Sequence, residues 1–218
     1  MRQERQVGWW PLVASWALIA AAFALRAWAT AGTNPLILDT DDAMRLTIVH
    51  DLLAGQGWFE FTQYRLNTPY GAPMHWSRLV DLPIAALLVL LRPLVGAGAA
   101  DLVVAYLWPT LLLFPFLWLT ARLALRLGGR ATVWPALLLP AFSLVTMAEF
   151  IPGRFDHHNI QIVLALVMLG SAIGALTRPV FAVGAGVAAG LAMTIGIESL
   201  PVVGATVMAF GLSWVARQ

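Results

Sequence analysis

The chain contains neither cysteine nor lysine, and only 11% of its 218 residues are charged. The absence of cysteine excludes disulfides and thiolate metal sites. Soluble domains usually carry about 25% charged residues, so this composition excludes a soluble enzyme and a disordered tail. The thirteen basic residues are all arginine, and they are scattered along the chain rather than clustered. That distribution argues against a nucleic-acid partner.

What the chain has in excess is apolar sequence, which makes up 60% of it. Crossing a bilayer core of about 30 Å takes about 20 apolar residues in a helix. The first apolar run, 9–29, is longer than the core of a signal peptide and contains tryptophan and Arg26, so we interpret it as a retained span. The apolar segments are 9–29, 82–100, 102–121, 131–150, 159–177, 180–197 and 199–216.

Segment 82–100 decides the topology, because Arg92-Pro93 lies near its middle. A central arginine is costly in lipid, and proline removes a helical hydrogen bond. If this segment lies on the outer membrane surface, one group of arginines falls entirely in the cytoplasm, as the positive-inside rule requires. That group is Arg2, Arg5, Arg122, Arg126, Arg130, Arg178 and Arg217. The same choice places ten of the eleven acidic residues, all except Glu4, on or near the extracytoplasmic side.

The sequence therefore predicts an all-α, multi-pass protein of the plasma (inner) membrane, with about six spans and a cytoplasmic N-terminus. The external loop 30–101 is expected to carry two juxtamembrane helices, the first from Asp42 to Ala54. The expected spans are 9–29, 102–121, 131–150, 159–177, 180–197 and 199–216.

The first cluster of candidate functional residues is Asp39-Thr-Asp-Asp-Ala-Met-Arg45, directly after the first span. Three carboxylates in four residues repel one another unless a cation or a helix N-terminus offsets the repulsion. Helix capping by Asp41 or Asp42 is the alternative interpretation.

The second cluster is Arg154-Phe-Asp156-His157-His158-Asn159, in a short loop on the same side of the membrane. Carboxylate and imidazole groups in this pattern suit a divalent metal, and an arginine fork suits phosphate. A capped helix start is the alternative. Because both clusters face one side, we expect their acids to converge on one cation.

A third group, Tyr64-Arg65 with His75-Trp-Ser-Arg78, suits the membrane interface or a lipid-linked phosphate. Glu149 and Glu198 border the outer ends of spans, where ionisable groups usually face a cavity or the interface. The residues expected to bind substrate are Arg45, Arg78 and Arg154.

This layout resembles the GT-C membrane glycosyltransferases, particularly the catalytic subunit of oligosaccharyltransferases. The segment Asp39 to Arg45 is similar to the family's D-x-x-x-N-Y-R pattern in its outer residues, with Ala43 and Met44 in place of Asn-Tyr. Pro69-Tyr-Gly71 resembles its turn, and Asp156-His-His158 falls where the family has D-x-D or D-x-E. The order of these elements agrees from residue 9 to about 177.

The resemblance implies an enzyme that uses a polyprenyl-phosphate or polyprenyl-diphosphate sugar donor on the extracytoplasmic side. It implies Asp39 and Asp156 as ligands of a divalent metal, Mg²⁺ or Mn²⁺, with His158 as a third ligand that favours Mn²⁺. Such a metal would stabilise charge on the departing lipid phosphate. In other GT-C branches an acidic pair of the first loop is the catalytic base, which here implies Asp41 and Asp42.

The later external loop and the soluble C-terminal domain of the oligosaccharyltransferase family have no counterpart, so we expect an N-terminal part of a longer transferase, or a missing partner subunit. The chain alone is then expected to be inactive or incomplete. A non-enzymatic membrane protein remains the alternative, either a transporter half or a lipid-binding accessory subunit. A purely structural anchor is the third hypothesis, and it predicts no cost for changing Asp39, Asp42 or Asp156 to alanine.

Overall fold

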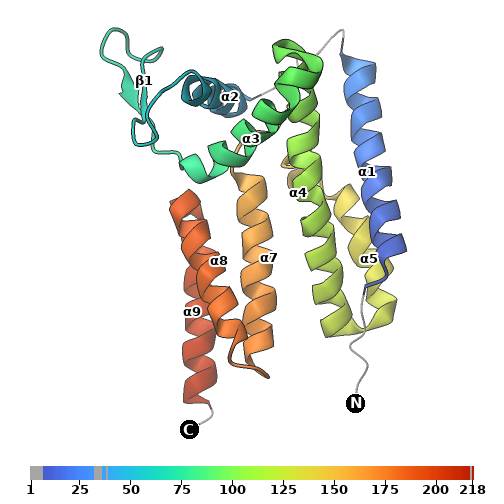
Figure 1. The fold of residues 1–218 in the computed structure, drawn as a ribbon. Helices are drawn as coiled ribbons and strands as arrows, with labels where there is room; N and C mark the ends of the chain where they lie inside the picture. Colours follow the sequence, from blue (N-terminus) through green and yellow to red (C-terminus); the bar gives the residue numbers. More distant parts are fainter. Residues whose placement is uncertain (1–6, 32–35, 38, 217) are drawn as a thin grey trace.

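The computed structural model describes residues 7–31, 36–37, 39–216 and 218, and the regular structure of these residues is helical apart from one small hairpin. The helices that run along the long axis of the molecule, which we call the long helices, lie side by side, and two transverse helices, α2 and α3, lie across one end of them (Figure 1). The long helices are α1 (Trp9–Thr30), α4 (Ala97–Gly128), α7 (His158–Ala175), α8 (Phe181–Ile195) and α9 (Leu200–Val215). The transverse helices are α2 (Thr40–Leu53) and α3 (Arg78–Val95).

Short elements fill the connections. Strands β1 (Thr62–Gln63) and β2 (Ala72–Pro73) form a small antiparallel hairpin between α2 and α3. The single-turn helices are η1 (Arg130–Thr132), η2 (Leu139–Phe142) and η3 (Ile197–Ser199), and the short α-helices are α5 (Val133–Leu138) and α6 (Leu144–Ala148).

The segment whose arginine argued against a span forms most of α3. This helix ends at Gly96, whose φ of 83° is in the left-handed region that glycine adopts readily, and α4 begins at the next residue. The break turns the chain from the transverse direction of α3 into the long direction of α4 (Figure 1). Helix α4 therefore begins five residues before the predicted boundary at 102 and continues to Gly128.

The segment predicted as one span over 131–150 is not one continuous helix. It consists of η1, α5, η2 and α6 in succession. Pro135 and Pro140 lack the N–H groups that a continuous helix needs, and Ser143 takes an extended conformation, with ψ of 96°. The prolines are plain in the sequence, so this interruption of the helix was predictable from it.

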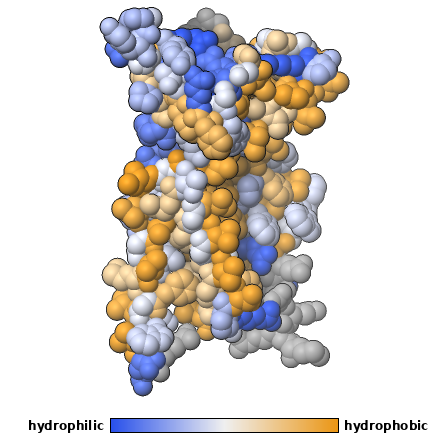
Figure 2. All heavy atoms as spheres, turned by 60° about the vertical axis from the view of Figure 1, so that its left-hand side comes forward, coloured by the Kyte–Doolittle hydropathy of each residue, from blue (hydrophilic) through white to orange (hydrophobic). Residues whose placement is uncertain are grey.

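Among the described residues, four helical segments are long and apolar enough to cross a membrane. They are Trp9–Thr30, Ala97–Gly128, His158–Ala175 and Ile197–Val215, and Phe181–Ile195 is a shorter apolar helix packed along α7. On the face shown in Figure 2, hydrophobic residues predominate over the middle, hydrophilic residues gather at the end that carries α2 and α3, and smaller hydrophilic groups lie at the opposite end. These features indicate a membrane-associated, all-helical protein.

The two ends of the helices differ in charge. Helix α1 begins and α9 ends at one end, and α2, α3 and the start of α7 lie at the other (Figure 1). The connections at the first end contain Arg130 and Arg178, and Arg126 is in the last turn of α4. Arg2, Arg5, Arg217 and Glu4 lie outside the described residues. The described acidic residues all belong to segments at the second end, which we call the acidic end; they are Asp39, Asp41, Asp42, Asp51, Glu60, Asp81, Asp101, Glu149, Asp156 and Glu198.

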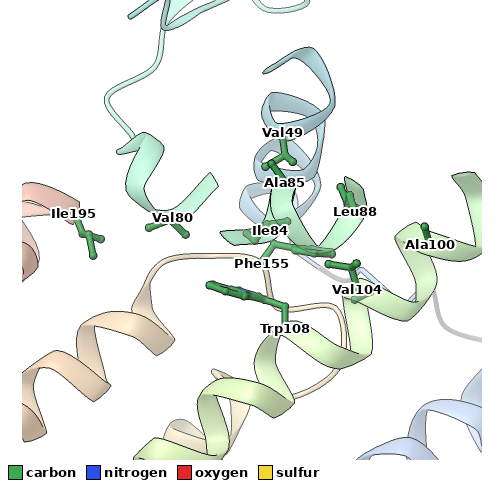
Figure 3. Packing of buried hydrophobic residues seen from close by; sticks show 11 residues of the cluster. Val49, Val80, Ile84, Ala85, Leu88, Ala100, Val104, Trp108, Phe155 and Ile195 are labelled. Atoms are coloured by element: carbon green, nitrogen blue, oxygen red, sulfur yellow. The ribbon is translucent and has the colours of Figure 1, made fainter. Parts of the chain in front are cut away.

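Besides a small apolar cluster between α7, α8 and α9, two larger apolar clusters hold the described helices together. One joins α1, α4, α5 and α7, where the Trp16 indole also donates a 2.9 Å hydrogen bond to the carbonyl of Thr110. The other joins α2, α3, α4 and the loop before α7, and it lies directly beneath the charged residues of the acidic end. In Figure 3 the Phe155 ring lies between Ile84 of α3 and Trp108 of α4. This packing fixes the loop that carries the second candidate cluster.

Candidate functional site at the acidic end

The two charged clusters, more than 100 residues apart in sequence, meet in the structure at Asp42. One oxygen of this buried carboxylate, Oδ1, accepts hydrogen bonds from the backbone N–H groups of Phe155 (2.7 Å) and Asp156 (2.8 Å). The other oxygen, Oδ2, lies 3.1 Å from Nη1 of Arg154. The first loop and the loop before α7 are therefore parts of a single site.

Helix α2 begins at this site because Asp39 caps it. The Asp39 carboxylate accepts a hydrogen bond from the backbone N–H of Asp41 (3.0 Å), and this bond lowers the pKa of Asp39 below its ordinary value. Asp39 and Asp41 are exposed, whereas Asp42 points into the protein. Capping, predicted for Asp41 or Asp42 as the alternative to chemistry, thus falls to Asp39 and accounts for only one of the three carboxylates.

Arg154 lies among four carboxylates. Its Nη1 is 3.1 Å from Oδ2 of Asp39 and of Asp42, and its Nη2 is 2.8 Å from Oε2 of Glu149 and 4.0 Å from Oδ2 of Asp156. Burial acts to lower the pKa of Arg154, but these carboxylates, Glu149 first, raise it above its ordinary value. The guanidinium is therefore a permanent positive charge that joins the two clusters.

Asp156 is buried beside the two histidines that follow it. Its Oδ1 accepts hydrogen bonds from the backbone N–H of His157 (2.7 Å) and from the Nδ1 of the same residue, and its Oδ2 lies 3.3 Å from Nε2 of His158. Burial acts to raise the pKa of Asp156, but the hydrogen bonds from His157 prevail and hold the pKa well below its ordinary value. Asp156 is thus a carboxylate at neutral pH.

The net pKa shift of Asp42 is opposite to that of Asp156, because at Asp42 the effect of burial prevails. Burial raises the pKa of Asp42 above its ordinary value, although Arg154 and the two backbone N–H groups oppose that effect. Two neighbouring carboxylates of the same site consequently differ in their affinity for a proton.

A second charged network, entirely buried, lies behind this site. Nη1 of Arg45 is 2.9 Å from Oδ1 of Asp81, and Nη1 of Arg78 is 3.3 Å from Oδ2 of the same carboxylate. The Arg45 guanidinium also stacks on Trp76, 4.6 Å from the ring centre, and its Nη2 is 3.8 Å from Oδ1 of Asp156. This network connects α2 and α3 to the loop before α7.

The burial of Arg45 and Arg78 argues against the substrate-binding role predicted for them. Arg45 is 0% exposed and Arg78 is 3% exposed. Arg78 directs its other terminal nitrogen, Nη2, to Oε1 of Gln56 (3.0 Å) and the carbonyl of Glu60 (2.7 Å). Both arginines therefore act as internal counter-ions of Asp81 in this arrangement, and a bound phosphate could not reach them without rearrangement.

Glu198 reaches the site from the connection between α8 and α9, although the sequence had indicated only that it borders a span. Its Oε2 lies 3.2 Å from Nε2 of Gln161 and 3.7 Å from Nε2 of His157. Gln161 also contacts His158, through its Oε1 and the imidazole Nδ1 (3.1 Å). Both Glu198 and Glu149 belong to the site. The sequence feature that pointed to them is that each borders the outer end of a predicted span.

The residues implied as metal ligands were Asp39, Asp156 and His158. Asp156 and His158 are neighbours. Oδ1 of Asp39 caps α2, and its other oxygen, Oδ2, is paired with Arg154. Among the described residues, no three acidic or imidazole side chains are grouped so that they could hold a metal ion. The side chains as arranged do not fit the three-ligand set, because an ion there would have to displace Arg154.

Gly153 allows the loop before α7 to pass close to the first loop. Its φ is 94°, its N–H donates to the carbonyl of Ala105 (2.8 Å), and a Cβ atom there would collide with the carbonyl oxygen of Leu36. No L side chain fits both the conformation and the space.

We therefore expect Gly153→Ala to displace the loop 149–157 and to lower the free energy of unfolding by about 2 kcal/mol or more, with a lower thermal transition. Gly55 also has a positive φ (107°), but a Cβ there would meet open space. Gly55→Ala is the matched control, and the thermal transition of both variants in detergent is the measurement. An equal loss of stability in the two variants would mean that the contact with Leu36 has no energetic weight.

Comparisons with models of protein families, with curated proteins and with solved structures found no match for this chain.

Proposed function

We propose that the chain is a GT-C-type glycosyltransferase module that takes sugar from a polyprenyl-phosphate or polyprenyl-diphosphate donor. The observation that carries the proposal is the bonding of Asp42 to the backbone of Phe155 and Asp156. It joins the two acidic segments on which the resemblance rests. The joined segments lie at the end of the helices, where a lipid-borne phosphate and a water-soluble acceptor could meet.

The residues of the site divide by exposure. Asp39 and Asp41 are exposed at the start of α2, and the His158 side chain is 42% exposed. Asp42 and Asp156 are buried and bonded to the loop backbone. We assign substrate contact and proton transfer to the exposed carboxylates, because a base must come within hydrogen-bond reach of the proton that it removes. The buried pair holds the loop in place.

The arginines at the opposite end give the proposed orientation. Arg122, Arg126, Arg130 and Arg178 belong to the end of α4 and to the connections at that end. By the positive-inside rule this end is cytoplasmic, which puts the acidic end on the extracytoplasmic face of the inner membrane. A polyprenyl-linked donor presents its sugar at such a face.

An apolar groove between α7 and α9 supports a substrate with a lipid tail. It has a volume of about 350 Å³ and is lined by residues such as Leu169, Ile173 and Phe210. The same groove also suits the second candidate function, a lipid-binding accessory subunit without activity of its own.

The test uses the chain in lipid nanodiscs with a polyprenyl-phosphate-linked radiolabelled hexose. The joined site holds the candidate bases, so, against the expectation that the chain alone is inactive, we expect the wild type to bind the donor and to release label into water or onto an added acceptor. Asp39→Asn and Asp41→Asn should each reduce release by about 100-fold or more while binding persists, because each removes a candidate base. Asp51→Asn is the control, since Asp51 pairs with Arg65 beside the hairpin, at the same end but outside the site.

The outcomes separate the candidates. Binding without release in the wild type would favour the accessory subunit. Release that survives both substitutions would remove these carboxylates from the chemistry. Absence of binding would contradict both functions.

A further inference from the structure

We propose that Arg154 is the resident cation of the acidic site and takes the place among the carboxylates that a divalent metal would otherwise fill. The proposal concerns ion binding by the site, so it holds whether or not the chain is a transferase. It differs from the metal ligation that the family resemblance implies.

The geometry of Arg154 is the first argument. Three carboxylates, those of Asp39, Asp42 and Glu149, lie 2.8–3.1 Å from its terminal nitrogens, and Asp156 lies at 4.0 Å. A guanidinium offers planar, forked donors that suit several carboxylates at once. One side chain thus supplies the charge that these acids need to lie together.

The origin of the ligands is the second argument. Asp39 and Asp42 come from the start of α2, whereas Glu149 and Asp156 flank Arg154 in the loop before α7. A cation that joins these two segments has the structural effect of a bound metal, which is to hold distant carboxylates at one point. Because Arg154 is part of the chain, its local concentration at the site greatly exceeds that of any dissolved ion.

The balance of charge is the third argument. Four carboxylates surround the Arg154 guanidinium. Its removal would leave Asp39, Asp42 and Glu149 without this arginine, whereas Asp156 would keep Nη2 of Arg45, 3.8 Å from its Oδ1. Hard divalent ions such as Mn²⁺ and Mg²⁺ prefer oxygen ligands of this type. The carboxylates as arranged in the described part of the chain do not form a metal-ligand group. We therefore expect them to bind metal only when Arg154 is replaced and they can close around the ion.

The test is a titration of the full chain in nanodiscs with Mn²⁺, with free ion measured by electron paramagnetic resonance. We expect no saturable site on the wild type at micromolar Mn²⁺. Arg154→Met keeps much of the side-chain volume but removes the charge, and it should gain one Mn²⁺ per chain with at least about tenfold tighter binding, a difference of about 1.4 kcal/mol. Its thermal transition should rise with Mn²⁺, whereas that of the wild type should not.

Arg65→Met is the matched control. It frees the single carboxylate of Asp51 from its arginine and should gain no Mn²⁺ site. A stoichiometric Mn²⁺ site on the wild type that Asp39→Asn or Asp156→Asn abolishes would overturn the proposal, and this measurement decides even if Arg154→Met does not fold. A folded Arg154→Met that gains no Mn²⁺ would overturn it as well.

Discussion

Replacing Arg45 by alanine is expected to destabilise the protein by about 3 kcal/mol or more. Arg45 and Asp81 are both fully buried, and removal of one partner leaves the other charge without its main compensation in a low-dielectric interior. Asp81 keeps Arg78, but at the longer distance of 3.3 Å. The stacking of the guanidinium on Trp76 is lost at the same time.

The measurement is the free energy of unfolding in mixed micelles. Arg65→Ala is the control, because it breaks an ion pair whose arginine side chain is 62% exposed, and it should cost less than about 1 kcal/mol. Arg45→Lys should give an intermediate loss, since lysine restores the charge but not the planar fork. Equal effects of Arg45→Ala and Arg65→Ala would show that the buried network contributes nothing.

Replacing Asp42 by alanine is expected to cost a similar amount, about 3 kcal/mol, and to loosen the loop before α7. The substitution leaves the N–H groups of Phe155 and Asp156 buried without an acceptor, at about 1–3 kcal/mol each, and removes one partner of Arg154. Asp42→Asn retains an oxygen for the two N–H groups and should lose roughly half as much.

The neighbouring residue supplies the control for Asp42. Asp41→Ala removes an exposed carboxylate one position away and should change stability by less than about 0.5 kcal/mol. Hydrogen exchange locates the effect, because the amides of Phe155 and Asp156 should exchange faster in Asp42→Ala and at the wild-type rate in Asp41→Ala. Unchanged protection in Asp42→Ala would mean that these two hydrogen bonds do not hold the loop.

Much of the fold was predictable because lipid imposes simple rules on sequence. Long apolar runs predicted the helices, and the position of Arg92 within its apolar segment distinguished α3 from the spans. The segment 131–150 shows the limit of that reasoning. Its apolarity predicted one span, although it contains Pro135 and Pro140, whose missing N–H groups interrupt a helix.

The candidate site was predictable in its location more than in its internal bonding. The charge asymmetry placed Asp39–Asp42 and Arg154–His158 on one side, and the structure brings them into contact. Which of Asp39, Asp41 and Asp42 points into the protein depends on how α2 is rotated about its axis. Helix α2 packs against α3, and this tertiary contact is not visible in the sequence. For the same reason the sequence could not show that Arg45 and Arg78 would turn toward Asp81 rather than toward a substrate.

The coupling free energy between Asp42 and Arg154 tests most directly whether the two acidic segments form one site. A double-mutant cycle with Asp42→Asn and Arg154→Met, read as the free energy of unfolding in mixed micelles, isolates this term. Arg154 and Asp42 lie 3.1 Å apart, with the arginine side chain partly buried and the carboxylate fully buried. We therefore predict a coupling free energy of about 1.5–3 kcal/mol. Effects that add to within about 0.5 kcal/mol would contradict the contact between Asp42 and Arg154 and, with it, the charged link between the two segments of the site.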